Sequence, residues 1–252
     1  MKITRCLRTL QSGIIYKRDL MKYKKACKLT GETKFIYNAK NRMVMLKDRY
    51  MAAGRVDGHY FFQDIFMAKE VFKASPEKHF DIASRLDGFI AHLLVCGIDV
   101  TMIDIRPLPF SIEGCNFIQG DVMDLCGKGI ESESIESLSC LHAIEHFGLG
   151  RYGDIIDPDG WRKALMSIQK VVKRGGVLYL SVPVSRENRV RFNAHREFEI
   201  HEIPNALKPY CELKKFVYIQ DAKIIEVDVK KDFESYKLNQ DYLCGCYIFE
   251  KR

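Results

Sequence analysis

The stretch Val172-Lys-Arg-Gly-Gly-Val-Leu-Tyr-Leu-Ser-Val-Pro183 predicts the fold of this chain, because it joins a helix to a buried strand. Apolar residues recur at helical spacing over 161–172, and the glycine pair then ends the helix. The mostly apolar run 177–182 is typical of a strand buried on both faces, and the proline closes it. A helix that leads directly into such a strand is half of a βαβ unit, which predicts a parallel sheet.

The same alternation extends from this stretch in both directions. Helices are predicted over 60–74 and 89–96, and strands at 79–83, 100–105, 116–119, 135–141 and 177–182. Downstream, a short helix near 200–207 precedes three closely spaced strand-like runs, which suggest an antiparallel edge: 213–220, 224–229 and 247–250. We therefore expect an α/β fold, a Rossmann-like three-layer sandwich with a mostly parallel seven-stranded sheet.

Residues 1–58 lack this alternation and carry much of the positive charge. The first thirty residues contain nine Lys or Arg and one acid, Asp19. We expect residues 1–58 to be a basic, mainly helical N-terminal extension, ahead of an α/β domain over 59–252. Such a helix either packs one side on the domain, which we favour, or makes a peripheral contact with anionic lipid headgroups.

The composition limits the functional class. Apolar residues make up 47% of the 252 residues, enough for a sizeable core, and the net charge of +7 suits an anionic small-molecule substrate without calling for nucleic acid. No stretch reaches the roughly 20 apolar residues of a membrane span, and no signal peptide is apparent. The nine cysteines lack CxxC pairs, which argues against disulfides, and Cys244 is expected to be a small buried hydrophobe. The alternative is that Cys244-Gly-Cys246 forms a metal or redox pair, but no second ligand pair lies near it in the sequence. These features favour a cytoplasmic protein, and they leave the oligomeric state open.

The loop after the first strand, Asp81-Ile-Ala-Ser-Arg-Leu-Asp-Gly88, lies where an open parallel sheet binds its ligand. Small residues let the backbone approach a ligand, so we expect cofactor contacts from Asp81, Ala83, Ser84 and Gly88. The loop lacks the GxGxxG pattern of pyrophosphate-binding loops, which favours a cofactor without phosphate, such as S-adenosylmethionine (SAM). The alternative is an ordinary turn with Asp87 as helix N-cap.

Two acids follow the second and third strands. Asp104, next to Ile105, lies where a carboxylate accepts hydrogen bonds from a ribose diol. Asp121, next to Val122, lies where it can bind an adenine amino group. We predict that all four residues bind the cofactor. The alternatives are that Asp104 pairs with Arg106 and that Asp121 caps a turn.

A dense set of ionisable and aromatic side chains follows the fourth strand: His142, Glu145, His146, Arg151, Tyr152 and Asp154. We expect His142 or His146 to act as a base with Glu145 orienting it, and His142 also to border the cofactor. Arg151, Tyr152 and Asp154 are expected to bind substrate. The order HxxEH resembles the inverted zinc-protease motif, but that motif belongs on a helix and this stretch breaks at a glycine, so we expect no metal.

A second basic set follows the fifth strand. Its members Arg186, Asn193, His195 and Arg196 are expected to bind substrate. Arginine binds carboxylates and phosphates with two parallel hydrogen bonds, so an anionic acceptor such as a sugar nucleotide would suit this set. The alternative is a solvated charged loop.

The order of these motifs resembles class I SAM-dependent methyltransferases over residues 78–184. The loop 81–88 stands at the place of their glycine-rich first motif, Asp104 at that of their ribose acid, and Gly120-Asp121 at that of their adenine-side motif. The segment His142-Ala-Ile-Glu-His146 resembles their xxxEH motif, and 172–183 resembles LKPGGxLxxxVP. Within that superfamily, the segments 84–89, 145–154 and 192–196 resemble a divergent branch catalogued as a domain of unknown function, which implies a bacterial surface-polysaccharide or glycan context.

The first motif departs from the family pattern, since Ala83, Arg85 and Asp87 stand where glycines are usual. The resemblance implies a SAM-dependent methyltransferase that methylates oxygen or nitrogen on a small, anionic or glycan-related acceptor. The altered loop supports a second hypothesis, a non-catalytic binding or scaffold protein that keeps the fold and lacks SAM affinity. A third is a metal-dependent hydrolase that uses His142, Glu145 and His146.

Overall fold

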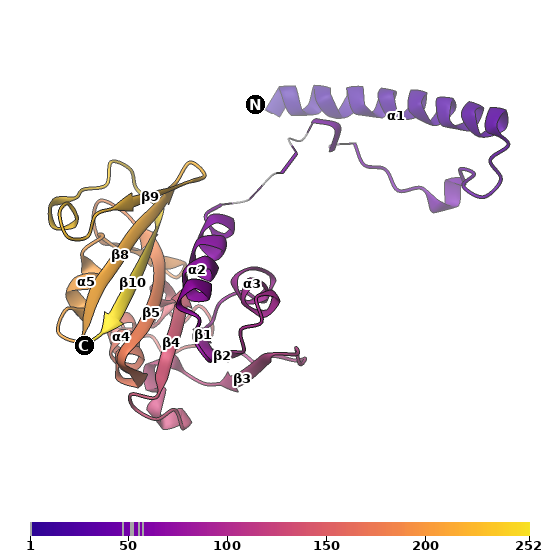
Figure 1. The fold of residues 1–252 in the computed structure, drawn as a ribbon. Coiled ribbons are helices and arrows are strands. Elements are labelled where there is room, and N and C mark those ends of the chain that lie inside the picture. The colour runs from indigo at the N-terminus through magenta and orange to yellow at the C-terminus, as the bar shows by residue number, and fades with distance from the viewer. Residues whose placement is uncertain (1, 47, 51–52, 55, 57) are drawn as a thin grey trace. The chain divides into compact units, whose positions relative to one another are not determined.

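The computed structural model describes residues 2–46, 48–50, 53–54, 56 and 58–252 (Figure 1). The chain divides into two compact units, Met1–Val56 and Asp57–Arg252. Among the residues that the structure describes, no helix combines the length and the apolar character needed to cross a bilayer.

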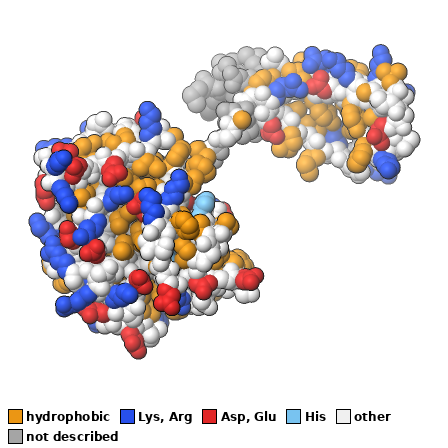
Figure 2. Space-filling view, in the orientation of Figure 1, with side chains coloured by type: hydrophobic (Ala, Val, Ile, Leu, Met, Phe, Trp, Pro, Cys, Tyr) orange, Lys and Arg blue, Asp and Glu red, His pale blue; other side chains and the backbone are white. Residues whose placement is uncertain are grey.

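The N-terminal unit is built on one long helix, α1 (Lys2–Thr30). The segment after it folds back onto the helix, because the Tyr23 hydroxyl donates to the Phe35 carbonyl at 2.6 Å and Arg49 pairs with Asp19 at 2.8 Å. The surface of this unit exposes large apolar side chains as well as lysines (Figure 2). The exposed apolar residues include Ile14, Met21, Phe35, Ile36, Met43 and Met45.

The second unit contains an eight-stranded sheet in the order β3-β2-β1-β4-β5-β10-β8-β9. Its strands are β1 (His79–Ile82), β2 (Val100–Asp104), β3 (Cys115–Gln119), β4 (Ile135–Leu141), β5 (Val172–Val184), β8 (Cys211–Gln220), β9 (Lys223–Val227) and β10 (Leu243–Lys251). The expected count of seven strands was wrong by one, because β8, β9 and β10 all join the sheet. A separate two-stranded ribbon pairs β6 (Arg189–Arg191) with β7 (His195–Glu197).

The sheet is parallel from β3 to β5 and antiparallel from β5 to β9, which confirms the mostly parallel sheet with an antiparallel edge. Helices cover both faces and make three layers (Figure 1). One apolar core includes residues of α2 (Tyr60–Ala74) and α3 (Ala91–Val95), and the other includes residues of α4 (Gly160–Val171) and α5 (Glu202–Leu207). The Rossmann-like sandwich is therefore the fold of this unit.

Two elements differ from their predicted form. A π-helical turn, Leu86–Ile90, precedes α3, so only part of the predicted helix 89–96 is α-helical. Strand β5 already begins at Val172, and the glycine pair lies inside it rather than at a helix end. A Cβ on Gly176 would lie 2.8 Å from the Lys173 carbonyl oxygen, so this position needs glycine at a place where the β4–β5 register shifts.

A polar network lies inside the sheet between β1 and β4. His79 is fully buried, and its Nδ1 and Nε2 lie 2.8 Å from the hydroxyls of Ser137 and Ser139. The Ser139 hydroxyl donates its one proton to Asp81, so it accepts from His79 Nε2–H while Ser137 donates to Nδ1. Burial lowers the pKa of His79 to about 3, which makes this ring neutral in the folded protein.

This network predicts a dependence of stability on acid. In the unfolded chain the His79 imidazole takes up a proton below about pH 6.5. In the folded protein the same ring stays neutral until about pH 3. His79 therefore contributes a loss of about 1.4 kcal/mol in the free energy of unfolding per pH unit across that window. We expect His79→Gln to show a shallower loss than the unsubstituted protein in urea unfolding at pH 7, 5.5 and 4.5. Identical slopes for the two proteins would refute the assignment.

Candidate active site

Two adjoining cavities lie beyond the carboxyl ends of β1, β2 and β4, where the strand order reverses. The smaller has a cavity volume of about 60 Å³ and the larger one of about 630 Å³, and both open to solvent. Their shared lining residues are Ala83, Arg106, His142, His146 and Tyr152. A ligand that spans both cavities would therefore pass the two histidines.

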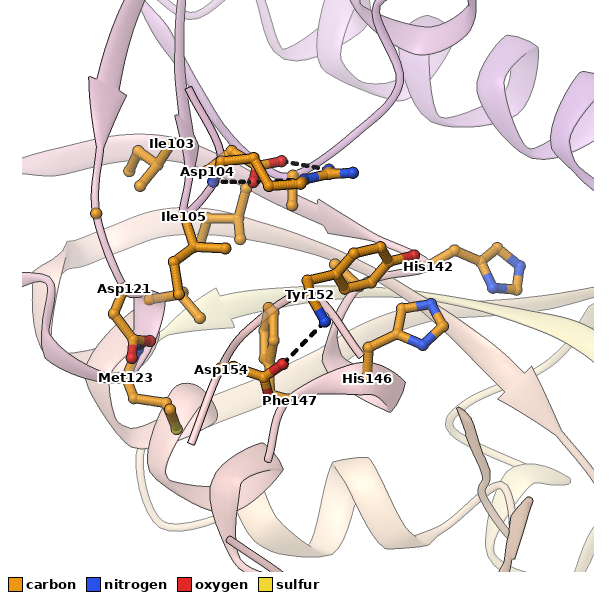
Figure 3. Close-up of a pocket in the computed structure, with 16 residues that line it drawn as sticks. Ile103, Asp104, Ile105, Asp121, Met123, His142, His146, Phe147, Tyr152 and Asp154 are labelled. Carbon is orange, nitrogen blue, oxygen red and sulfur yellow. Dashed lines mark hydrogen bonds and ion pairs between the residues drawn. The ribbon is translucent and has the colours of Figure 1, made fainter. Parts of the chain in front are cut away.

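The smaller cavity is lined by three acids, Asp104, Asp121 and Asp154, and by apolar side chains such as Ile103 and Ile105 (Figure 3). The Asp104 carboxylate is largely buried, and Arg106 holds it through the backbone N–H at 2.8 Å, Nε at 3.0 Å and Nη2 at 2.6 Å. Both lone pairs of Oδ1 are then occupied, and Oδ2 keeps one free. Asp104 thus lies at the cavity, as expected for a ribose-binding acid, and it also pairs with Arg106, as the alternative interpretation stated.

The neighbouring loop after β3 supplies the other wall of this cavity. Asp121 accepts from the Met123 backbone N–H at 2.9 Å and so caps the short turn Val122–Asp124, as the alternative interpretation stated. Asp121, the buried Val122 and Ile105 all line the smaller cavity. Their side chains thus stand at the same cavity as Asp104.

The loop after β1 makes a tight turn without the glycines that are usual in the first motif of class I methyltransferases. Ala83 has a φ of +58°, the left-handed conformation that glycine favours. Asp81 has no exposed surface and accepts from the Ser84 backbone N–H at 2.9 Å and hydroxyl at 2.7 Å. A Cβ on Gly88 would lie 2.1 Å from Asp64 Oδ2, so this glycine admits α2 close to the loop. Asp81 and Gly88 therefore shape the turn instead of lining a cavity, in contrast to the expectation of direct cofactor contact.

The end of β4 positions His142 and Glu145. The His142 backbone N–H donates to the Ser181 carbonyl and hydroxyl oxygens at 3.0 and 3.1 Å, and its φ is +50°. His142 Nδ1 lies 2.8 Å from Glu145 Oε1, and Glu145 is only 1% exposed. Glu145 therefore orients His142.

His146 has a different environment. Its Nδ1 lies 2.8 Å from the Ala194 carbonyl oxygen, which can only accept, so Nδ1 carries the proton and Nε2 has the free lone pair. Burial lowers the pKa of His146, so the ring is neutral near pH 7. His146 lines both cavities and is still partly exposed. This combination suits a general base.

Three of the residues that line the larger cavity have left-handed backbones: Ala83, His142 and Tyr242, with φ of +58°, +50° and +58°. This conformation costs a non-glycine residue about 1–2 kcal/mol. Strained residues cluster at functional sites, where the surrounding structure holds them in place. The strain therefore marks this cavity independently of its side-chain chemistry.

The predicted substrate residues divide into two groups. Arg151, Tyr152 and His195 line the larger cavity, and Tyr152 and Asp154 line the smaller one. Arg151 also donates to the Ala194 carbonyl at 2.9 Å. Asp154 shapes its own loop, because it accepts from the backbone N–H groups of Gly148 and Gly150 at 2.7 and 3.2 Å.

Three residues of the second basic set lie outside both cavities, in contrast to the prediction. Arg196 is buried and donates to the carbonyl oxygens of Phe147 and Pro158 at 2.7 and 3.2 Å, so it fastens the loop after β4. Arg186 makes a two-pronged ion pair with Asp241 at 2.9 Å. Asn193 is exposed in the turn between β6 and β7. Their polar groups were visible in the sequence, but their partners were not.

Several lining residues were missed by the sequence analysis. Gly58, His59, Tyr60, Gln63 and Asp64 come from α2 and the residues before it, and Tyr242 precedes β10. Burial raises the pKa of Asp64, whose Oδ1 accepts from the Gln63 amide at 2.9 Å. These positions precede or follow the recognisable motifs, and only the polar pair Gln63-Asp64 within an apolar helix could have indicated them.

Comparison with known proteins agrees with the fold. Residues 131–216 match a family described as Caenorhabditis protein of unknown function, DUF268. Sequence comparison with the curated proteins gives no match. Many of the similar solved structures are SAM-dependent methyltransferases.

Two of these structures illustrate the match. A SAM-dependent methyltransferase from Archaeoglobus fulgidus is 13% identical, with a TM-score of 0.50, over 75% of this chain and 94% of that one. The [4+2]-cyclase SpnF is 12% identical, with a TM-score of 0.52, over 74% and 80%. At such identities the likeness shows the fold alone, and the second protein's name shows that similar folds are found in proteins named for different chemistries.

The loop that carries Arg151 and Tyr152 gives a matched test of the site's architecture. Gly148 and Gly153 both have left-handed backbones, with φ of +78° and +85°, but a Cβ on Gly148 would lie 1.9 Å from the Asp157 carbonyl oxygen while one on Gly153 meets nothing within 4 Å. We expect Gly148→Ala to lower the free energy of unfolding by about 3 kcal/mol more than Gly153→Ala, since only the first adds a clash. Urea unfolding measures both, and equal losses would contradict the packing of this loop.

Proposed function

We propose that this chain is a SAM-dependent methyltransferase that methylates oxygen or nitrogen on a small, anionic or glycan-related acceptor. The observation that carries the proposal is the pair of joined cavities at the strand-order reversal, with Asp104 lining the smaller one and His146 lining both. We further propose that residues 59–252 form the catalytic domain, that the protein acts in the cytoplasm in polysaccharide biosynthesis, and that the basic residues 1–58 form a mainly helical extension.

The residues of the smaller cavity fit the adenosine part of SAM. Ile105 and Val122 line it and offer apolar contact for a base. The free lone pair of Asp104 Oδ2 would accept from a ribose hydroxyl, and displacement of the exposed Arg106 guanidinium would free two more, one on each carboxylate oxygen. Asp64, in the larger cavity, would accept from the cofactor's ammonium group. When bound, SAM supplies an electrophilic methyl group on a sulfonium sulfur.

His146 is the residue best placed to act as the base. Its Nδ1–H is held by the Ala194 carbonyl, so its Nε2 lone pair would take the proton of an acceptor hydroxyl as the oxygen attacks the methyl carbon. Glu145 Oε1 lies 3.8 Å from Nε2 and would stabilise the imidazolium that results. His142, the other candidate, has a fully buried Nε2 and is less accessible to an acceptor.

The walls of the larger cavity support an anionic or glycan-related acceptor. Arg85, Arg106 and Arg151 line it and would attract carboxylate or phosphate groups. Tyr60 and Tyr152 add aromatic surface, which packs well against the apolar faces of sugar rings. Burial raises the pKa of Tyr60 to about 12, so its hydroxyl stays protonated and donates a hydrogen bond.

One observation favours the second candidate, a non-catalytic scaffold. Arg106 occupies three of the four lone pairs of Asp104, so a ribose must compete with an intact ion pair. A protein in which this pair never opens would keep the fold without binding SAM. Ligand binding separates the two functions.

The first test is calorimetry with S-adenosylhomocysteine, the stable product of methyl transfer. We expect the unsubstituted chain to bind it, and Asp104→Ala to raise Kd about tenfold or more through loss of a charge-assisted hydrogen bond. Asp159→Ala is the matched control, since Asp159 also pairs with an arginine but on the exposed start of α4. The absence of binding heat from the unsubstituted chain would favour the scaffold.

The second test concerns the base. With tritiated SAM and a panel of hexuronic acids and sugar nucleotides, we expect His146→Gln to lower kcat about 10²–10⁴-fold while Kd for S-adenosylhomocysteine stays unchanged. Because burial lowers the pKa of His146, the rate of the unsubstituted enzyme should be level at neutral pH and fall only on the acid side. The control is His201→Gln, whose imidazole pairs with Glu199 outside both cavities. Full turnover by His146→Gln would show that this histidine is not the base.

A further inference from the structure

Three side chains from distant parts of the second unit meet beside the larger cavity. His59 precedes α2, His142 follows β4, and Cys244 lies in β10. One ring nitrogen of each histidine and the Cys244 sulfur all lie within 4.8 Å of one another. Two nitrogens and one sulfur at this spacing form a possible ligand set for a metal ion.

The buried nitrogen of His142 is an independent indication of a ligand. The His142 side chain is 7% exposed, and its Nε2 has no hydrogen-bond partner among the residues that the structure describes. Buried polar atoms in folded proteins are nearly always paired, so this atom calls for an explanation. Glu145 Oε1 accepts the Nδ1 proton at 2.8 Å, which leaves the Nε2 lone pair free. Histidines that bind metals show this same arrangement, with a carboxylate on the other ring nitrogen.

His59 is half-buried and lies beside His142. Its ring centroid lies 6.4 Å from that of His142 and 5.9 Å from that of Tyr242. Both histidines line the larger cavity, so a metal ion between them could be reached from that space.

Cys244 completes the set from the interior. Its side chain is fully buried, and its sulfur contacts only the Gln63 side-chain oxygen at 3.5 Å and the Cys246 sulfur at 3.8 Å among the interactions of the described residues. Burial raises the pKa of the Cys244 thiol, so in the metal-free protein it is protonated. On metal binding the S–H bond would break, the sulfur–metal bond would form, and the proton would pass to solvent.

We propose that His59, His142 and Cys244 bind one divalent transition-metal ion, with zinc as the best match, and leave one coordination position open toward the larger cavity. Zinc accepts mixed imidazole and thiolate ligands in tetrahedral geometry, and three protein ligands with an open position are typical of catalytic zinc sites. The open position suits an anionic oxygen or sulfur of a small molecule in the larger cavity. This inference does not rest on methyl transfer, because the ligand set stands without a cofactor.

The structure thus favours a metal site where the sequence led us to expect none, and it changes the ligands of the zinc alternative. That alternative used His142, Glu145 and His146, but Glu145 is the hydrogen-bond partner of His142 and His146 directs its Nδ1 to Ala194. Only His142 is common to both sets. His146 keeps its free lone pair and remains the base of the proposed reaction.

Cobalt(II) is the probe for this site, because it replaces zinc in tetrahedral sites and absorbs light. We expect the full chain, after treatment with a chelator, to bind one equivalent of Co²⁺ with a sulfur-to-cobalt charge-transfer band and intense visible bands. One proton should be released per ion, from the Cys244 thiol, and Zn²⁺ should bleach the spectrum. If no charge-transfer band forms, the proposal is wrong.

Variants assign the ligands. We expect Cys244→Ser to lose the charge-transfer band and His59→Gln to weaken Co²⁺ binding at least about tenfold. Cys246→Ser is the matched control, since Cys246 is equally buried two residues along the same strand and should keep the band. If circular dichroism shows that Cys244→Ser does not fold, His59→Gln still tests the proposal, because His59 is only half-buried. Unchanged cobalt affinity in His59→Gln would refute the metal site. Retention of the band in Cys244→Ser would also overturn it.

Calorimetry with S-adenosylhomocysteine on the same preparations separates this inference from the proposed function. Binding of that ligand without a cobalt band would leave the methyltransferase proposal standing and exclude the metal site. A cobalt band without binding of S-adenosylhomocysteine would support the metal site and contradict the methyltransferase proposal.

Discussion

The pairing of β1 with β2 on one side and β4 on the other is the constraint on which the site depends. Because the chain continues to β2 and β3 on one side and returns to β4 on the other, the loops beyond the carboxyl ends of β1 and β4 diverge and leave a space between them. Asp81 shapes the turn above this space from inside the sheet, where it joins Ser84 of the turn to Ser139 of β4. The left-handed Ala83 adopts the conformation that glycine favours, so the turn is tight without a glycine at this position.

Hydrogen bonds between charged side chains and backbone groups hold the loop after β4 in place. Asp154 satisfies backbone N–H groups within the loop, and the buried Arg196 satisfies carbonyl oxygens from the other side. Ala194 then accepts from both His146 and Arg151. Among the described residues, these contacts leave the Nε2 lone pairs of His146 and His142 free. The His146 side chain is 11% exposed, whereas His142 Nε2 is fully buried. We assign the His146 lone pair to proton transfer and the His142 lone pair to a metal ion.

The sequence predicted elements and positions that follow from local patterns. The helix Tyr60–Ala74 and strand β4 have the predicted bounds, and Asp104 and His142–His146 follow their strands as the alternation of strands and helices required. It could not predict residues brought in by tertiary contacts, such as His59 before the first strand and Cys244 near the end of the chain. The sequence also led us to expect that Arg186 and Arg196 bind substrate, because it shows their charges and not their partners. Arg186 pairs with Asp241, and Arg196 donates to backbone carbonyl oxygens.

The central claim is that SAM binds across the two cavities, and a crystal structure of the chain grown with S-adenosylhomocysteine tests it most directly. The account predicts ribose hydroxyls at the Asp104 carboxylate with the Arg106 guanidinium displaced, the adenine between Ile105 and Val122, and the amino-acid end near Asp64. A structure at saturating ligand in which the Asp104–Arg106 pair stays closed and no ligand occupies the smaller cavity would contradict it.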